Sequence, residues 1–393
     1  MTEGVEVNSL AEVLADLERR GIPEAQRIYP INDYLSMKAR LQNVPSNGGF
    51  ELTPFCNLDC KMCYVHLRPD QLEPGQRLLT VDEWKNLIDQ AVDAGMISAD
   101  LTGGECLTYP GFKEVYLHLR SKGIRPAVLT NGRLLTEDMV AFFAENPPSV
   151  IQVTVYGSSD DAYEKVCGHR AFQEVMDGIE RAKNAGLKVY CTITPSRYMQ
   201  DDADALFEML RAKGVTYYLG GSMLPARAET GRDLNEFSVE IDAYMSMLKK
   251  ERLYRATLKH DAEAVEVPRY MPPFKGELRG LPCGGGHSGF HINWKGEMCP
   301  CIAFSHTVHI PIPEGGFLEA WKKVGEAMDT YQAPAECRDC KLKERCLSCP
   351  GEKSMSGLDG QLNKAVCIRL QKTANWTKQA ETEKTCQKEE ISR

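Results

Sequence analysis

The sequence predicts an α/β protein whose main part is a partial, open (β/α)6 barrel of the TIM type, followed by a small cysteine-rich domain. Segments typical of strands alternate with segments typical of helices from residue 49 to about residue 223, which indicates a parallel sheet with helical crossovers. Six such units fall short of the eight that close a barrel. The cysteines form two groups, three near residue 60 and eight between residues 283 and 367. The second group predicts a separate metal-binding domain.

The expected strands and helices follow one another in chain order. The first barrel helix begins at a capping box formed by Thr80 and Glu83, and its apolar residues recur with the spacing of one helical face. Expected strands cover residues 50–53, 98–102, 126–130, 150–155, 188–193 and 215–219. Expected later helices cover residues 112–120, 136–145, 172–185 and 203–212, with a more polar helix at 238–258.

These patterns divide the chain into five segments. Residues 1–47 are a lead-in with one helical face at Leu10, Val13, Leu14 and Leu17. We expect the barrel at residues 48–237, a helical bridge and linker at 238–280, the cysteine-rich domain at 281–372 and a polar tail at 373–393.

Composition excludes several classes of protein. Apolar residues make up 42% of the chain, and a formal net charge of −8 disfavours nucleic acid and anionic membranes as partners. No apolar run reaches 18 residues, and the acidic N-terminus does not resemble a signal peptide. We therefore expect a cytoplasmic protein. In that reducing compartment, 15 cysteines indicate metal ligation rather than disulfides.

A loop with three cysteines directly follows the first expected strand. Cys56, Cys60 and Cys63 have the spacing C-x3-C-x2-C. Three thiolates within eight residues can converge on one iron–sulfur cube, and a cube held by three thiolates keeps one iron open for another ligand. The alternative is a zinc loop or a set of reactive thiols, because short cysteine spacings also suit zinc.

This cysteine loop resembles the signature of the radical S-adenosylmethionine (radical SAM) enzymes. The resemblance implies a [4Fe–4S] cluster whose open iron is chelated by the amino and carboxylate groups of S-adenosylmethionine. The loop departs from the family pattern at Met62, where an aromatic residue usually lies near the adenine. Methionine is apolar and polarizable enough to cover a purine.

Polar, glycine-rich junctions follow the expected strands at the end of the sheet where barrel active sites are built. The residues after the second strand, Gly103, Gly104 and Glu105, resemble the GGE motif of the family. The resemblance implies that they receive the ammonium group of S-adenosylmethionine, and glycine lets the backbone approach the ligand closely.

Later junctions supply further expected site residues. The resemblance assigns Thr154 to the ribose or carboxylate of S-adenosylmethionine, and the positions of Asn131 and Arg197 suggest two more contacts. Cys167 lies shortly after the fourth strand, where a thiol could return a hydrogen atom to a radical. A buried bystander is the alternative for this cysteine.

The second cysteine group resembles the seven-cysteine SPASM extension of radical SAM enzymes that act on peptides and related substrates. The resemblance implies an iron–sulfur domain with two auxiliary [4Fe–4S] clusters, three clusters in all. One would take Cys337, Cys340, Cys346 and Cys367, and the other Cys283, Cys301 and Cys349. The spacing departs from the family where two residues, not three, separate Cys346 from Cys349. Two zinc ribbons are the alternative.

The sequence leaves open the fourth ligand of the cluster at Cys283, Cys301 and Cys349. Cys299 lies two residues before Cys301, so in an extended strand both side chains would point to one face. We therefore expect Cys299 to be this ligand. The alternative is an open iron that binds a substrate thiolate.

The resemblance implies an enzyme that reductively cleaves S-adenosylmethionine to a 5′-deoxyadenosyl radical, which abstracts a hydrogen atom from a peptide. We expect maturation of a ribosomally made peptide by a thioether or carbon–carbon crosslink. Alternatives are oxidation of a sulfatase residue to formylglycine, modification of a small molecule or tetrapyrrole, and a non-enzymatic iron–sulfur electron carrier. Expected partners are the peptide, a reductant such as flavodoxin or ferredoxin and, because the lead-in is short, a separate leader-binding protein unless the peptide binds directly.

Overall fold

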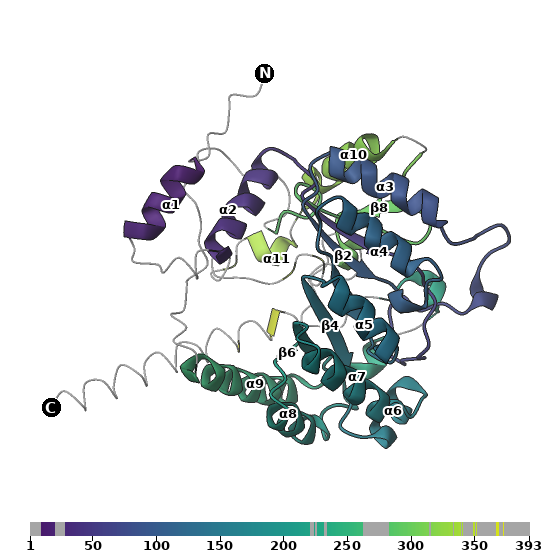
Figure 1. Ribbon diagram of the computed structural model, residues 1–393, viewed down its shortest axis with the longest axis vertical. Helices are drawn as coiled ribbons and strands as arrows, with labels where there is room; N and C mark the ends of the chain where they lie inside the picture. Colours follow the sequence, from purple (N-terminus) through teal and green to yellow (C-terminus); the bar gives the residue numbers. More distant parts are fainter. Residues whose placement is uncertain are drawn as a thin grey trace.

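The computed structural model describes residues 9–19, 28–220, 224, 226–231, 234–261, 283–313, 316–332, 334–338, 340, 349, 351, 367–368 and 372. Two helices, α1 (Leu10–Arg19) and α2 (Ile28–Leu41), precede an alternating series of strands and helices (Figure 1). The strands of this series are β1 (Asn47–Glu51), β2 (Ser98–Thr102), β3 (Ala127–Thr130), β4 (Val150–Val155), β5 (Val189–Ile193) and β6 (Tyr217–Leu219). Its helices are α3 (Val81–Asp93), α4 (Phe112–Ser121), α5 (Glu137–Glu145), α6 (Asp160–Cys167), α7 (Phe172–Asn184), α8 (Ala203–Ala212) and α9 (Ile241–Asp261).

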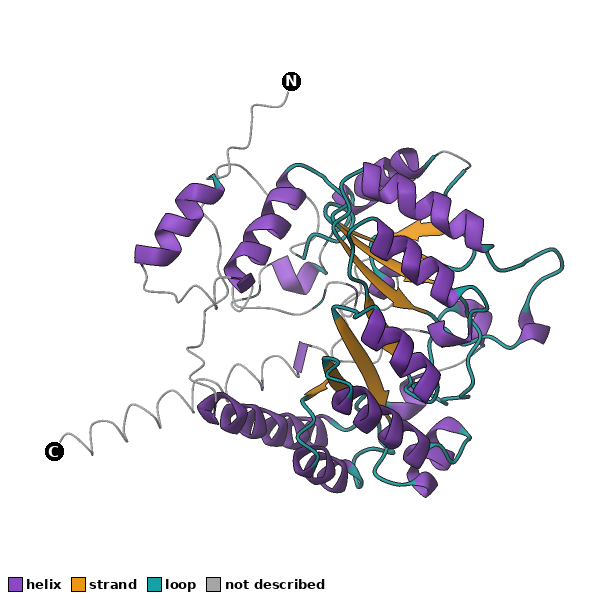
Figure 2. Cartoon of the chain, viewed as in Figure 1, coloured by secondary structure: helices purple, strands orange, loops and turns teal. Residues whose placement is uncertain are grey.

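The six expected strands form one parallel sheet in the order β1 to β6, which confirms the predicted class of fold. The helices between the strands lie over one face of this sheet, where α3, α4, α5 and α7 are seen side by side (Figures 1 and 2). Strands β2 and β4 have the predicted bounds, and β1 begins three residues earlier than predicted.

Three further strands, which the sequence did not predict, extend the sheet beyond β1. They are β7 (Gly289–Ile292), β8 (Glu297–Cys299) and β9 (Ile310–Pro311). β7 runs parallel to β1, from the Asn47–Gly289 pair to the Phe50–Ile292 pair, and β8 and β9 follow antiparallel. The cysteine-rich part of the chain therefore begins as a continuation of the barrel sheet. The domain boundaries at 237, 280 and 372 stay a prediction.

An aromatic core crosses the junction between β1 and β7. Phe50 on β1 lies edge-on to Trp84 of α3 at 6.0 Å between centroids, and to Phe290 of β7 at 5.9 Å. Phe290 in turn contacts Phe317 of α10 (Phe317–Asp329) at 5.2 Å. Edge-to-face packing adds to the apolar area that these rings bury. The core is continuous from the barrel into the C-terminal part.

Two helices of the N-terminal half were not predicted, although the sequence carries signals for both. Pro30 lies in the first turn of α2, where a missing N–H leaves no helical hydrogen bond unmade. Ser159 caps α6 by accepting a hydrogen bond from the N–H of Ala162 at 3.2 Å, and Gly168 ends it with a φ of 72°. Left-handed backbone of this kind favours glycine.

The face of the sheet opposite the helices is polar and partly open. On β4, Ile151, Val153 and Val155 are buried, whereas Gln152 and Thr154, on the opposite face, are half-buried. None of the residues of β1–β6 is Lys or Arg, and the two carboxylates, Glu51 and Asp100, both lie on the face opposite the helices. We call this surface the concave face.

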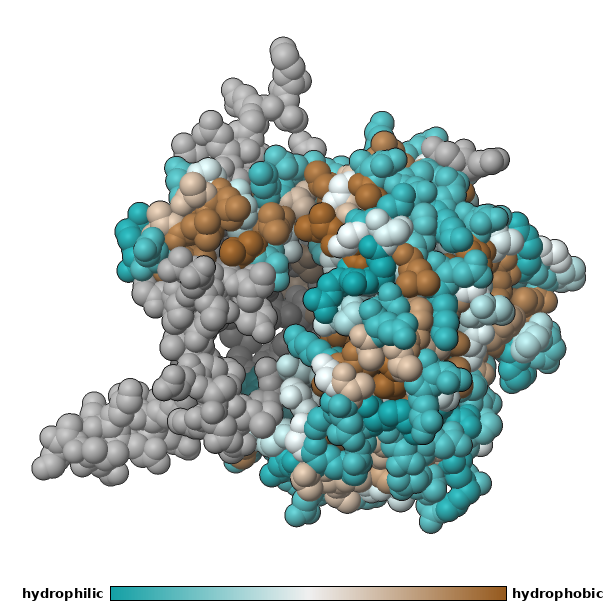
Figure 3. Space-filling view, in the orientation of Figure 1, coloured by the Kyte–Doolittle hydropathy of each residue, from teal (hydrophilic) through white to brown (hydrophobic). Residues whose placement is uncertain are grey.

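None of the helices in the described ranges combines the length and apolarity needed to cross a membrane. Figure 3 shows apolar surface over α1 and α2, to which the exposed side chains of Leu10 and Leu35 belong.

Candidate active site

The cysteine loop leaves the carboxyl end of β1 and is held by α6. The N–H groups of Asp59 and Lys61 donate to the carbonyl oxygens of Cys167 and Val166, each at 3.0 Å, at the end of α6. Main-chain bonds of this kind fix the loop at the end of the sheet where the sequence predicted the site.

The three loop thiols fit an iron–sulfur cluster by their chemistry. The N–H of Leu58 points at Cys56 Sγ at 3.4 Å and the N–H of His66 at Cys63 Sγ at 3.3 Å, and such bonds are typical of cluster sulfurs. Burial raises the pKa of the Cys56 thiol, and the charge of Cys60 is among the further causes, so thiolates here need a compensating cation. In the described ranges, no three His, Cys, Asp or Glu side chains converge on one metal ion. The thiolates of a cube bind different irons and need not meet at a point.

Gly103 and Gly104 pack directly against the strand end that leads into the cysteine loop. Gly104 N donates to the carbonyl oxygen of Thr53 at 2.7 Å, and Glu105 N to that of Phe55 at 2.9 Å. A Cβ on Gly103 would lie 2.6 Å from the Thr53 oxygen, and one on Gly104 would lie 2.4 Å from the Phe55 oxygen. We expected glycine because of a close ligand. The structure gives another reason, which is the close approach of two backbone segments.

Glu105 is 1% exposed and joins two strand junctions. Its Oε1 accepts from Leu107 N at 3.1 Å and from Thr130 Oγ1 at 2.8 Å, and its Oε2 accepts from Asn131 N at 2.7 Å. Cys106 Sγ is a fourth donor, to Oε1 at 3.9 Å. Burial raises the pKa of this carboxyl, although hydrogen bonds from the four donors lower it. Each carboxylate oxygen offers about two acceptor positions, and among the described residues Oε2 accepts from Asn131 alone, so one position on Oε2 is left for a ligand. An ammonium group there would stabilise the ionised form.

The expected contacts Asn131, Thr154 and Arg197 lie in different surroundings. Asn131 Nδ2 donates to Cys56 Sγ at 3.5 Å and to Asn57 Oδ1 at 2.7 Å, so the structure brings Asn131 to the cysteine loop. Thr154 is half-buried on the concave face. Arg197 is exposed, with its guanidinium 5.4 Å from the Tyr198 ring centroid. Their contacts with S-adenosylmethionine stay predictions.

Tyr156 is a site residue that sequence reasoning missed. Burial raises the pKa of its phenol well above the ordinary value, and the charges of Cys60, Cys167, Cys63 and Cys56 raise it further. The phenol therefore lies within electrostatic reach of the loop cysteines and of Cys167, which is fully buried at the end of α6. Its place at the carboxyl end of β4 was the available signal. The proposed hydrogen-donor role of Cys167 stays a prediction, as does the contact of the buried Met62 with adenine.

Three of the auxiliary cysteines lie near one another, as the sequence suggested. Burial raises the pKa of the Cys301 thiol to about 12, and the charges of Cys283 and Cys349 are the next causes, so these three lie near one another. Cys299 instead donates from Sγ to the carbonyl oxygen of His291 at 3.4 Å. This contact points Cys299 toward β7, and its assignment as fourth ligand of that cluster stays a prediction.

The other auxiliary set is only partly described. Cys337 and Cys340 form one turn, with Cys340 N donating to the Cys337 carbonyl oxygen at 3.5 Å. Cys367 is half-buried, and Cys346 lies outside the described residues. The predicted ligand set therefore stays a prediction.

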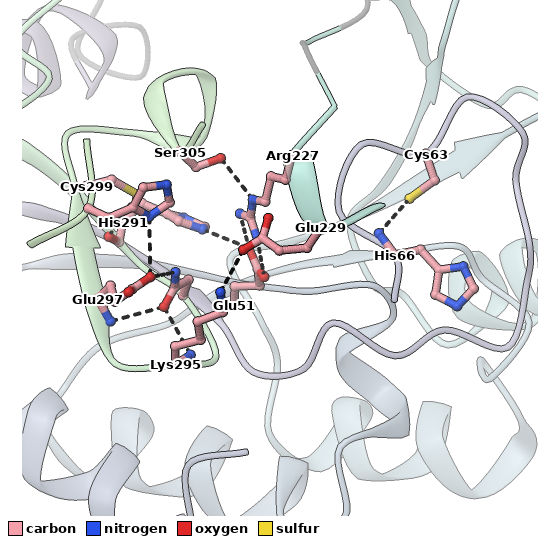
Figure 4. A network of polar contacts seen from close by, with 12 residues as sticks. Glu51, Cys63, His66, Arg227, Glu229, His291, Lys295, Glu297, Cys299 and Ser305 are labelled. Carbon is pink, nitrogen blue, oxygen red and sulfur yellow. Dashed lines mark hydrogen bonds and ion pairs between the residues drawn. The ribbon is translucent and has the colours of Figure 1, made fainter. Parts of the chain in front are cut away.

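A buried ion pair lies between the cysteine loop and the auxiliary cysteines (Figure 4). Arg227, which follows β6, donates from Nη1 to Glu51 Oε1 at 2.7 Å and from Nη2 to Glu51 Oε2 at 2.5 Å. His291 Nε2 lies 3.3 Å from the same carboxylate, and Arg227 Nε donates to Ser305 Oγ at 3.2 Å. Burial raises the pKa of Glu51, but Arg227 and His291 together lower it to about 2. No local pattern in the sequence indicated this network.

Comparison with known proteins identifies the barrel. Residues 50–210 match the Radical SAM superfamily. The AdoMet-dependent heme synthase of Methanosarcina barkeri is 24% identical over an alignment of 330 residues, and the match covers 79% of this chain and 92% of that protein. The sporulation killing factor maturation protein SkfB of Bacillus subtilis is 22% identical over 331 residues, 84% of this chain and 74% of SkfB.

The fold itself has a solved counterpart. The crystal structure of Streptococcus suis SuiB bound to precursor peptide SuiA has a TM-score of 0.62 at 13% identity, and the match covers 90% of this chain and 86% of SuiB. At this identity the likeness concerns the fold. The cysteine loop at the carboxyl end of β1, the partial barrel and the sequence match agree: the chain is a radical SAM enzyme, a member of a superfamily that uses S-adenosylmethionine and a [4Fe–4S] cluster.

Proposed function

We propose that this enzyme modifies a peptide, and that it holds three [4Fe–4S] clusters. Cys56, Cys60 and Cys63 would hold the cluster that binds S-adenosylmethionine, and the two auxiliary clusters would take the cysteines of the C-terminal group. When bound, the reduced cluster and S-adenosylmethionine would supply a 5′-deoxyadenosyl radical, the species that would take a hydrogen atom from the peptide. The outcome we propose is a thioether or carbon–carbon crosslink.

The chain's own residues would bind and shelter the cosubstrate. Glu105 would accept the ammonium group at the remaining acceptor position of Oε2, while its four protein donors keep the carboxylate in place. Asn131, at 3.5 Å from Cys56 Sγ, would orient that sulfur. The buried Cys167 and the half-buried Tyr156 lie near the loop and would help to exclude water from it.

The observation that carries the choice of a peptide is the charge of the concave face. Its strand residues include no Lys or Arg. Glu51 is buried and already paired with Arg227, which leaves Asp100 as the exposed carboxylate of this face. Amide groups and cationic side chains of a peptide suit a surface with an exposed carboxylate and with neutral polar groups such as Gln152 and Tyr190, which bond to each other at 2.5 Å. SkfB is named a maturation protein and SuiB was crystallised with its precursor peptide, which supports the same choice.

A second candidate is modification of a tetrapyrrole. The heme synthase of Methanosarcina barkeri favours it, because the match covers 92% of that protein. A porphyrin carries several carboxylates, and each would need a cation or other donor when buried. The strands of the concave face carry no Lys or Arg and expose the carboxylate of Asp100, which disfavours such a substrate. Formylglycine formation, a peptide reaction, remains an alternative outcome of the same site.

The experiment compares the two substrate classes with reconstituted, anaerobic enzyme. One reaction contains synthetic peptides that correspond to short reading frames found beside this gene, and the other contains iron-coproporphyrin. Both are followed by 5′-deoxyadenosine release and mass spectrometry. We expect product with the peptide, with loss of hydrogen for a crosslink. Decarboxylated porphyrin would contradict the proposal, and absence of 5′-deoxyadenosine would leave electron transfer as the function. A reductant such as flavodoxin or ferredoxin, and a separate leader-binding protein, are the partners that we propose to supply in parallel reactions.

A further inference from the structure

We propose that Arg227 is a positioning residue that fixes the auxiliary-cluster segment against the barrel and sets the reduction potential of the cluster at Cys283, Cys301 and Cys349. The inference rests on the proposed function, because that cluster is part of it.

Arg227 joins three segments that are far apart in the sequence. Its guanidinium binds both oxygens of Glu51 at the end of β1, and its Nε binds Ser305, four residues after Cys301. Its main-chain N–H donates to the carbonyl oxygen of Tyr64, next to Cys63, at 3.1 Å. Arg227 is 6% exposed and Glu51 is 1% exposed. A planar, two-pronged contact of this kind positions its partners more strictly than a lysine could.

The same arginine lies between the two groups of cysteines. Cys299 of β8 donates from Sγ to the carbonyl oxygen of His291 at 3.4 Å, and His291 Nε2 lies 3.3 Å from the Glu51 carboxylate that Arg227 binds. Figure 4 shows the guanidinium beside Glu51, with Cys299 and His291 on one side and Cys63 farther away on the other. The guanidinium of Arg227 thus contacts both the barrel and the auxiliary-cluster segment.

The direction in which Arg227 shifts the reduction potential follows from its charge. Reduction adds an electron to a cluster, so a nearby positive charge favours the reduced form and raises the potential. Glu51 is ionised at neutral pH and offsets this charge. Removing the Glu51 charge should therefore raise the auxiliary potential, and removing the Arg227 charge should lower it. If Arg227 had a purely structural role, removing its charge and removing the Glu51 charge would not shift the potential in opposite directions.

The test is a redox titration of the reconstituted full-length protein, followed by electron paramagnetic resonance of the auxiliary cluster. Glu51→Gln should move the midpoint potential upward and Arg227→Gln should move it downward. Arg227→Lys keeps the charge and should shift the potential less than Arg227→Gln. Shifts of the same sign for the two Gln variants, no shift in either, or an equal shift for Lys and Gln would each overturn the proposal.

Arg133→Gln is the matched control. Arg133 also pairs with a glutamate, Glu174 at 2.8 Å, and also donates to the cysteine loop, at the carbonyl oxygen of Asn57. Arg133→Gln should leave the reduction potential of the auxiliary cluster unchanged. A shift as large as that of Arg227→Gln would contradict a specific role of Arg227. If Arg227→Gln does not fold, Glu51→Gln and Arg227→Lys decide the question by the same criteria. Iron analysis separates the two levels of inference: wild-type protein without auxiliary clusters refutes the proposed function, whereas full clusters with unmoved potentials refute the role of Arg227.

Discussion

Replacing Glu105 with glutamine tests the carboxylate that links the strand junctions to the cosubstrate. Glutamine has the same shape but one acceptor oxygen, so in either orientation of its amide one N–H, of Leu107 or of Asn131, loses its acceptor. An unpaired buried donor costs about 1–3 kcal/mol. Part of this cost is offset because burial disfavours the ionised carboxylate in the native protein. We therefore expect the free energy of unfolding to fall by about 1–2 kcal/mol.

The effect on the cosubstrate should be larger. A charge-assisted contact between Glu105 and the ammonium group is worth about 1.5–3 kcal/mol, so the Kd for S-adenosylmethionine should rise about ten- to a hundredfold. Isothermal titration calorimetry under anaerobic conditions measures the Kd, and urea denaturation of the same preparation measures stability. Glu114→Gln, on the exposed surface and 3.7 Å from Lys85, is the control and should change stability by less than about 0.5 kcal/mol. An unchanged Kd combined with a lower free energy of unfolding would show that Glu105 has a structural role only.

Replacing the three loop cysteines together with alanine should remove one of the three proposed clusters and abolish 5′-deoxyadenosine formation; unchanged iron content or persistent cleavage would contradict the ligand assignment. Gly104→Ala places a Cβ 2.4 Å from the Phe55 carbonyl oxygen and should lower the free energy of unfolding by about 3 kcal/mol in urea denaturation, whereas Gly289→Ala, whose Cβ has no neighbour nearer than 3.9 Å, should not. Burial raises the pKa of Glu51, but Arg227 and His291 lower it to about 2 from an ordinary 4.5, so the pair contributes about 3 kcal/mol above pH 4.5 that is lost as the pH falls toward 2. When the free energy of unfolding is measured as a function of pH, Glu51→Gln should lack this loss of stability between pH 4.5 and pH 2. The same pH dependence in the variant and the wild type would show that the pair does not contribute.

Local patterns predicted the barrel well and the contacts between distant segments poorly. Strand β4 was found with its bounds because its buried residues alternate with half-buried ones, and α3 was found because Thr80 and Glu83 form its capping box. β7 was missed because Gly289–Ile292 is short and pairs with β1, about 240 residues earlier, which leaves no local trace.

In the candidate site, too, local motifs were predicted and contacts between distant segments were not. The cysteine loop and the glycine-rich junction were recognised because each is contiguous in the sequence. The Glu51–Arg227 pair spans 176 residues, and neither member lies in a distinctive motif. Cys299 was predicted to face the same way as Cys301 from its spacing alone. β8 ends at Cys299, the backbone of Cys301 is extended, and a short helical segment follows it, so the role of Cys299 stays a prediction.

The pairing of β7 with β1 has a consequence for how the protein can be made. A chain that ended before β7 would leave the main-chain groups of Asn47–Phe50 without partners on one side, and Phe50 would lose its contact with Phe290. A strand with an open edge is a template for pairing with another molecule, so the isolated barrel should aggregate rather than fold as a unit. During synthesis the same edge stays open until the ribosome has added more than two hundred further residues, which makes β1 the strand that most needs protection before the chain is finished.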